Sequence, residues 1–128
     1  MNKARVDSYI PKAADALVEC GIAVNGEIKK AFRGQVSSFG AAVASGSLIA
    51  AVAAFIEKGN AAVDRGRLIR AIEAILAAED GEQTSLFDRV LAAAGSSDRF
   101  DLFAMKERVL DAALALKLAM NLYRLTDD

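Results

Sequence analysis

The chain has 128 residues, the length of one ordinary domain. It is 54% hydrophobic, with 27 alanines, no tryptophan and one proline, which excludes a disordered chain and favours helices over a β-sandwich. It contains no histidine and one cysteine, which excludes histidine-dependent catalysis, zinc fingers and intrachain disulfides. The net charge of −1 is unlike that of a free-standing nucleic-acid binder.

The N-terminal residues contain no apolar segment of the kind found in secretory signals, and a single cysteine is typical of a reducing compartment. We therefore expect a cytoplasmic protein. Cys20 lies among Leu17, Val18 and Ile22, which favours a buried small side chain over a reactive thiol.

Apolar residues recur at helical spacing along most of the chain, and the sequence predicts six helices. Pro11 should kink the first helix or mark its first ordered turn, Asn25-Gly26 should end it, and Thr84 should cap the fifth. No segment alternates like a strand, so we expect residues 1–128 to form a single all-α domain, a compact bundle of about five to six helices with a long C-terminal helix. The predicted helices span residues 4–24, 27–44, 47–58, 63–79, 84–94 and 98–125.

Residues 34–56 carry no charge and are numerous enough to cross a bilayer. Ser45-Gly46-Ser47 resembles a corner between two helices, however, and a helix buried in a soluble bundle is equally apolar, so we expect no membrane contact. The stretch is also rich in small residues, which let backbones approach closely. These residues serve either internal packing or the docking of another protein, and we take internal packing as the default.

The charge is distributed unevenly, with +4 on residues 1–70 and −5 on residues 71–128. Basic residues form three groups without matching acids, a pattern typical of surfaces that bind phosphates, although most charged rows are only solvated faces. At 100° per residue, the members of the third group, which lie on the predicted final helix, fall within about 20° of one line along that helix. Because few aromatic residues lie among them, any contact would be to the backbone of a nucleic acid. The groups are Lys29, Lys30 and Arg33; Lys58, Arg65, Arg67 and Arg70; and Arg99, Lys106, Lys117 and Arg124.

No catalytic or metal-binding pattern stands out. No Gly-rich loop is followed by Lys-Ser/Thr, and no acids can be paired on facing helices for a two-metal site. The acids Glu79, Asp80, Glu82 and Asp88 lack the order of a calcium loop and are explained as solvated loop residues. We expect no enzymatic activity, no cofactor and no metal.

Residues 32–42 (FRGQVSSFGAA) and 45–55 (SGSLIAAVAAF) together resemble the small helical subunit of the type III-B CRISPR effector, the Cmr complex. That family has an aromatic residue with Gly, then Ser-Phe-Gly-Ala, then Ser/Asn-Gly-Leu, then an apolar run ending in Phe or Tyr. Here Ser47 intervenes between Gly46 and Leu48, and a position that is often Pro in the family is Ala. The start of the fourth helix and the Lys-containing apolar end also agree, so the resemblance covers nearly the whole chain.

The resemblance implies a non-catalytic subunit that stacks along an RNA-guided assembly in antiviral defence, beside larger subunits that hold the cutting residues. Its partners would be other CRISPR effector subunits and the backbone of guide and target RNA, with possible self-association. The motif residues Gly34, Ser38, Phe39, Gly40 and Gly46 should be structural. Contacts to RNA are expected first from Lys29, Lys30, Arg33, Arg65, Arg67 and Arg70, and second from Arg99, Lys106, Lys117 and Arg124. A helical protein–protein adaptor without a nucleic-acid role is the alternative.

Overall fold

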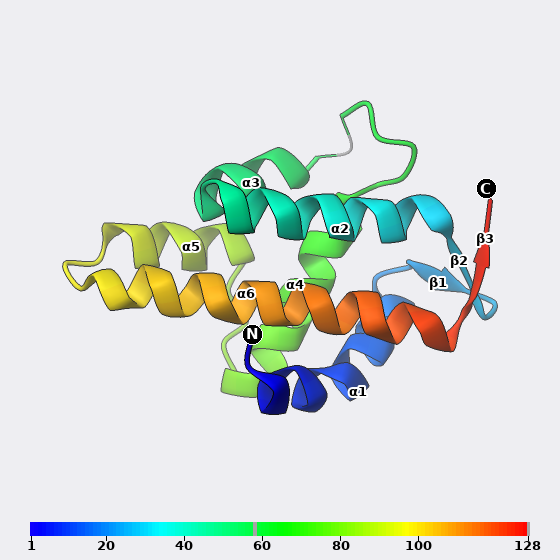
Figure 1. The fold of residues 1–128 in the computed structure, drawn as a ribbon, viewed down its shortest axis with the longest axis horizontal. Coiled ribbons are helices and arrows are strands. Elements are labelled where there is room, and N and C mark those ends of the chain that lie inside the picture. The colour runs from blue at the N-terminus through cyan, green and yellow to red at the C-terminus, as the bar shows by residue number, and fades with distance from the viewer. Residues whose placement is uncertain (58, 128) are drawn as a thin grey trace.

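Figure 1 shows the computed structural model, which describes residues 1–57 and 59–127. Within these residues the chain forms six α-helices, and the predicted all-α fold class with a long C-terminal helix is confirmed. The helices are α1 (Lys3–Glu19), α2 (Lys30–Ser45), α3 (Leu48–Phe55), α4 (Gly66–Asp80), α5 (Leu86–Gly95) and α6 (Arg99–Ala119).

The longest helix, α6, is the centre of the bundle and packs against α1, α2, α4 and α5. In Figure 1, α1 and α2 flank α6 on opposite sides and α4 crosses behind it. The buried face of α6 carries Ala112, Ala115 and Ala119 beside Leu116. Because the distance between packed helices depends on the side chains at the contact, these alanines let four helices approach one axis closely.

The helix caps are largely local features of the sequence. Four polar side chains each accept a hydrogen bond from a backbone N–H in the first turn of the helix that follows. The cap of α5 is one residue later than the predicted Thr84. Pro11 lies inside α1, and Lys58, the predicted end of the third helix, lies outside the described residues. The capping residues are Asn2, Ser47, Ser85 and Asp98.

The uncharged stretch at residues 34–56 forms the predicted corner. α2 ends at Ser45, Gly46 follows, and Ser47 caps α3. Phe39 of α2 and Phe55 of α3 then pack edge to face, with 5.2 Å between their ring centroids. Among residues 1–57 and 59–127, no helix has both the length and the apolar character needed to span a membrane.

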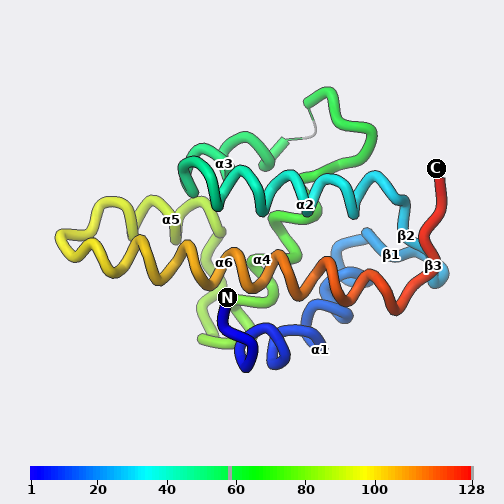
Figure 2. The backbone as a smooth tube through the Cα atoms, in the orientation of Figure 1, coloured from blue at the N-terminus to red at the C-terminus, as the bar shows by residue number. Residues whose placement is uncertain are grey.

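A small three-stranded sheet closes one end of the bundle and corrects the expectation that no segment forms a strand. β1 (Ala23–Val24) pairs antiparallel with β2 (Glu27–Lys29), and β2 pairs parallel with β3 (Arg124–Thr126). Figure 2 shows this sheet at the end of the molecule that also holds the C-terminus. The sheet therefore ties the segment that follows α1 to the C-terminal segment.

The turn between β1 and β2 corrects the predicted end of the first helix. Asn25 and Gly26 have φ values of 54° and 77°. Positive φ at both positions is the geometry of a two-residue type I′ hairpin turn, for which Asn-Gly is a preferred pair. α1 ends earlier, at Glu19, so the prediction that Asn25-Gly26 ends it is wrong.

The last helix is also shorter than predicted. α6 ends at Ala119, a 3-10 turn covers Met120–Leu122, and the chain then extends as β3. Leu125 lies opposite Ile28, a fully buried residue of β2. The extended pairing with β2 replaces the predicted helical turns, and it removes Arg124 from the surface of α6.

Candidate nucleic-acid interface

The first basic group lies where β2 leads into α2. Lys29 ends β2, Lys30 begins α2, and Arg33 lies one turn further on. The ammonium nitrogen of Lys30 is 3.0 Å from the Asp127 carboxylate, and Arg33 donates a 2.5 Å hydrogen bond to Asn121. The backbone of Lys29 pairs with β3, but its exposed side chain forms no ion pair or hydrogen bond with any residue in 1–57 or 59–127. The C-terminal segment thus lies against two of these cations and leaves the third open.

The N-terminus of α2 adds to the positive potential of this group. Its first turn contains no acidic residue, and the unpaired N–H groups of a helix N-terminus carry partial positive charge. The pair of Lys30 with Asp127 is exposed on both sides, and such pairs contribute at most about 1 kcal/mol. A phosphate can therefore displace Asp127 from Lys30 at little cost.

In the second group, Arg65 is held by the end of α3. It donates to the carbonyl oxygens of Ala54 and Glu57, at 2.7 and 3.0 Å, and its guanidinium lies 4.6 Å from the centroid of the Phe55 ring. These carbonyls belong to a helix C-terminus, where a cation is favourable. Arg65 therefore stabilises the end of α3, and these contacts occupy part of its guanidinium.

Arg67 and Arg70 share one acidic neighbour, Asp64, whose carboxylate lies 3.6 Å from each guanidinium. Arg67 also donates to the carbonyl of Cys20 at 3.0 Å. Its guanidinium lies directly over Gly21, where any Cβ atom would collide with it. Arg67 is thus fixed in place, whereas Arg70 is exposed.

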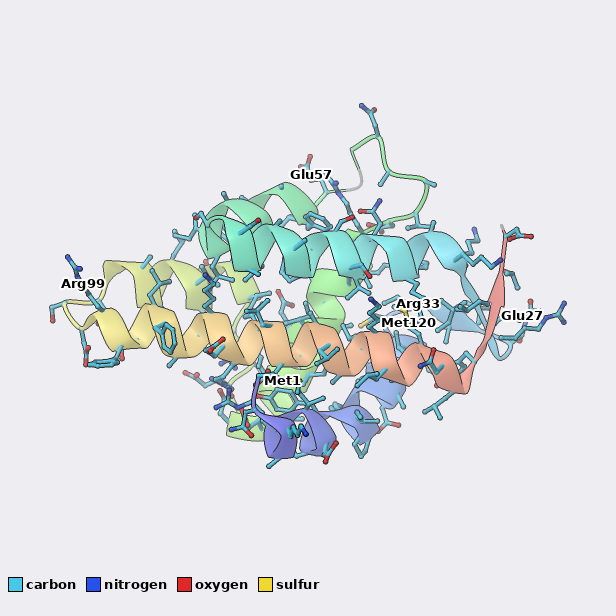
Figure 3. The ribbon with its side chains drawn as sticks, viewed as in Figure 1. Met1, Glu27, Arg33, Glu57, Arg99 and Met120 are labelled. Atoms are coloured by element: carbon cyan, nitrogen blue, oxygen red, sulfur yellow. The ribbon has the colours of Figure 1, made fainter. Side chains whose placement is uncertain are left out.

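A cavity of about 420 Å³ brings the first two basic groups together. It lies between the β1–β2 hairpin and the segment that leads into α4, and both Lys29 and Arg67 line it. Figure 3 shows this end of the molecule, with Arg33 and Glu27 labelled near β2 and β3. We use the name basic face for cations in β2 and in the first two turns of α2 and α4; of these, Lys29 and Arg67 line the cavity, together with the acids Glu27 and Asp64. Its members are Lys29, Lys30, Arg33, Arg67 and Arg70.

Three members of the third basic group, Arg99, Lys106 and Lys117, lie on α6 as predicted, and the fourth does not. Arg99 begins α6 at the end of the molecule far from Arg33 of α2 (Figure 3). Lys106 and Lys117 are half-buried further along α6. Arg124 lies in β3, where its guanidinium is 3.5 Å from the Glu27 carboxylate. The extension of the row to Arg124 is wrong because α6 ends before it.

The five motif residues occupy two kinds of environment. Phe39 is buried in the core, and a Cβ on Gly46 would lie 3.0 Å from the carbonyl oxygen of Ala42, so packing explains both. Gly34 and Ser38 are exposed on α2, and a Cβ on Gly34 or Gly40 would meet nothing within 4 Å. Internal packing therefore does not explain why Gly34, Ser38 and Gly40 are small.

A charge cluster joins α1, α4, α5 and α6, and it corrects the interpretation of its acids as solvated loop residues. Arg89 is buried and donates to both carboxylate oxygens of Asp80, at 2.8 and 2.9 Å. Arg108 lies 2.7 Å from Glu79 and 3.0 Å from Asp80. Tyr9 donates a 2.7 Å hydrogen bond to Glu79. Glu79 and Asp80 are thus ion-pair partners of arginines that are distant in sequence or across a loop.

The cluster holds its members in fixed charge states. Hydrogen bonds from Arg89 hold the pKa of Asp80 well below its usual range. Burial and the hydrogen bond to Glu79 raise the pKa of Tyr9 to about 12. Asp80 therefore stays ionised and Tyr9 stays protonated near pH 7, and both contribute to the ion pairs and hydrogen bonds that join these helices.

Cys20 and the acidic residues offer little for metal or thiol chemistry. Across the two described ranges, no three His, Cys, Asp or Glu side chains are grouped so that they could hold a metal ion. Cys20 is half-buried, and burial raises the pKa of its thiol, which disfavours the reactive thiolate.

Comparison with known proteins gives no match: no family model matches the sequence, and neither a curated protein nor a solved structure matches the chain. Functional inference therefore depends on the basic face, the exposed side of α2 and the sequence motif.

Proposed function

We propose that the chain is a non-catalytic, cytoplasmic small subunit of a type III-B CRISPR effector ribonucleoprotein, and that it contacts guide and target RNA through its basic face. The observation that carries the proposal is the convergence of two basic groups on one cavity. Lys29 and Arg67 belong to different groups in the sequence, yet both line this cavity. Together with the resemblance of residues 32–55, this convergence favours an RNA-bound subunit over an enzyme.

The basic face suits contact with phosphates rather than with bases. The side chain of Lys29 has no partner among the residues that the structure describes, Lys30 is held by one exposed ion pair, and Arg70 is exposed beside a shared acid. Each phosphate that such cations neutralise releases counterions, so binding weakens steeply as salt rises. The chain as a whole has a net charge of −1, so the isolated subunit should bind RNA weakly and the assembled complex should supply the remaining contacts.

Fluorescence anisotropy with a labelled single-stranded RNA tests the proposal on the isolated chain. The triple variant Lys29→Glu/Lys30→Glu/Arg70→Glu should weaken binding by about tenfold or more and flatten its salt dependence. Lys3→Glu/Lys12→Glu/Arg99→Glu makes the same change in net charge away from the basic face and should lose much less. Equal losses in both variants would assign the binding to net charge alone and overturn the proposed face.

A second candidate function, a protein–protein adaptor, is favoured by the uncovered side of α2. Gly34, Ser38, Ala41 and Ser45 are all exposed, and their spacing of three and four residues places them on one side of the helix. Small side chains on an exposed side allow the backbone of another helix to approach closely. The same surface could seat a neighbouring subunit within the ribonucleoprotein.

Ribonuclease treatment separates the two functions. Ser38→Arg should leave the fold intact and abolish the capture of partner proteins under either function. Digestion of the RNA should release part of the captured material from a ribonucleoprotein subunit, whereas an adaptor should retain all its partners. Partners that remain bound to Ser38→Arg would show that this side of α2 is not the docking surface.

A further inference from the structure

We infer that the cavity between the β1–β2 hairpin and the start of α4 is a binding site for a single nucleotide, with the phosphate on Lys29 and Arg67 and the base in the cavity. The inference deepens the proposed function and rests on it in one respect, since a bound RNA would be one source of the nucleotide. A free nucleotide has the same chemistry and is the other source.

The charges on the cavity wall leave one cation uncompensated. Glu27 is 3.5 Å from Arg124, and Asp64 is 3.6 Å from both Arg67 and Arg70. Lys29 has no such partner among the residues that the structure describes. The wall therefore favours a ligand that brings a negative group to Lys29.

Arg67, which lines the same cavity, is held in position by its neighbours. The carbonyl of Cys20 accepts from one guanidinium nitrogen at 3.0 Å, and the absence of a side chain at Gly21 provides the space for that nitrogen. Gly21 has a φ of 72°, a conformation that glycine adopts readily, so the close approach needs no strain. A guanidinium fixed in this way loses little conformational freedom when it binds an anion.

The rest of the cavity is built for more than an inorganic anion. Ile22, Phe32 and Val63 contribute an apolar surface, whereas Asn25 contributes a polar side chain. The volume of about 420 Å³ falls within the range of small-molecule sites, which combine apolar walls with a few polar groups that orient the ligand. Inorganic phosphate would leave the apolar wall in contact with water, and a purely apolar ligand would leave Lys29 unpaired. A planar base joined to a phosphate uses both.

Isothermal titration calorimetry with adenosine 5′-monophosphate tests the site directly. The nucleotide should bind the full chain about tenfold more tightly than adenosine or inorganic phosphate, because only the nucleotide uses both parts of the cavity. Lys29→Gln should weaken nucleotide binding about tenfold towards the level of adenosine, whereas the exposed control Lys3→Gln should leave it unchanged. A nucleotide that binds no better than adenosine, or equal binding by the two variants, would overturn the inference.

Competition by RNA identifies the source of the nucleotide. A single-stranded oligonucleotide that displaces the nucleotide, where a blunt duplex does not, assigns the cavity to an unpaired base of RNA. Failure of both to compete assigns it to a free nucleotide, and the site still stands. RNA binding without nucleotide binding would overturn the site and leave the proposed function, whereas nucleotide binding without RNA binding would do the reverse.

Discussion

Arg89 connects α4, α5 and the loop between them through one buried guanidinium. It donates to both oxygens of Asp80 and, at 2.8 Å, to the backbone carbonyl of Glu82. Removing one partner of a buried ion pair leaves the other uncompensated, which costs about 3 kcal/mol. Arg89→Ala should lower the free energy of unfolding by this amount in urea denaturation. Arg99→Ala, at an exposed position, should change it by less than about 0.5 kcal/mol.

Asp80 makes the stability of the fold depend on acid pH. Its pKa in the folded state lies below the value near 3.9 expected in the unfolded chain, so the unfolded state binds protons more readily. The contribution of Asp80 is therefore complete above about pH 4 and is lost as the pH falls towards its folded pKa. Urea denaturation at several pH values should show a steep acid decline in the wild type and a shallower one in Asp80→Asn. If the control Asp88→Asn shows the same shallow decline, Asp80 is not the group responsible.

Tyr9 has the opposite effect at alkaline pH. Its pKa of about 12 exceeds the value near 10 of an ordinary tyrosine, so its contribution is complete below pH 10 and is lost as the pH rises through 12. An ultraviolet absorbance titration should show a tyrosine that ionises near pH 12. That transition should disappear in Tyr9→Phe and persist in Tyr123→Phe. Its persistence in Tyr9→Phe would contradict the hydrogen bond between Tyr9 and Glu79.

At the scale of residues, the sequence reveals the kind of side chain and not its partner. Arg65 belongs to a basic group, but its contacts with the end of α3 depend on the path of the chain after Phe55. Asp80 and Arg89 lie on opposite sides of a loop, at no spacing that signals a contact. Lys29 is different, because an exposed cation at the end of a strand needs no ion-pair partner in the fold.

At the scale of helices, the glycines of α2 and α4 are small for different reasons. A Cβ on Gly34 would meet nothing, whereas a Cβ on Gly66 would collide with the backbone carbonyl of Ile56. Gly34→Ala should therefore raise the free energy of unfolding by about 0.5–1 kcal/mol, since alanine is the better helix former. Gly66→Ala should lower it by about 1–3 kcal/mol, because α3 and α4 must separate. Thermal denaturation of both variants checks the contrast, and a loss of stability in Gly34→Ala would show that α2 is covered by another part of the chain.

The elements that could be predicted are those set by local sequence. The helical periodicity, the caps at Ser47 and Asp98, and the corner at Gly46 all follow from neighbouring residues. The sheet could be predicted only in part. Asn25-Gly26 is a known hairpin signal, but β3 forms because Leu125 meets Ile28 from the other end of the sequence. Such non-local pairing leaves no periodic trace in residues 124–126.

At the scale of the molecule, the small net charge conceals local groups of positively charged side chains. Lys29 and Arg67 of the basic face line the cavity beside the sheet, whereas Arg99 marks the far end of α6 (Figure 3). The sequence located the basic groups, but only the fold shows that one cation from each of the first two groups lines the same cavity, and that Arg99 and Arg124 of the third group lie at opposite ends of the molecule. Near-neutrality is therefore compatible with a subunit that presents one basic surface to RNA shared with its neighbours.

The central claim, that the basic face holds RNA within an assembly, is tested most directly by purifying the tagged chain from its own cells and measuring the RNA that ribonuclease fails to digest. The wild type and Lys3→Glu/Lys12→Glu/Arg99→Glu should both retain protected RNA together with large effector subunits. Lys29→Glu/Lys30→Glu/Arg70→Glu should retain the subunits through the unaltered small-residue side of α2 and lose most of the protected RNA. Protection that is unchanged in this last variant, or a wild-type assembly that contains no RNA, would contradict the account.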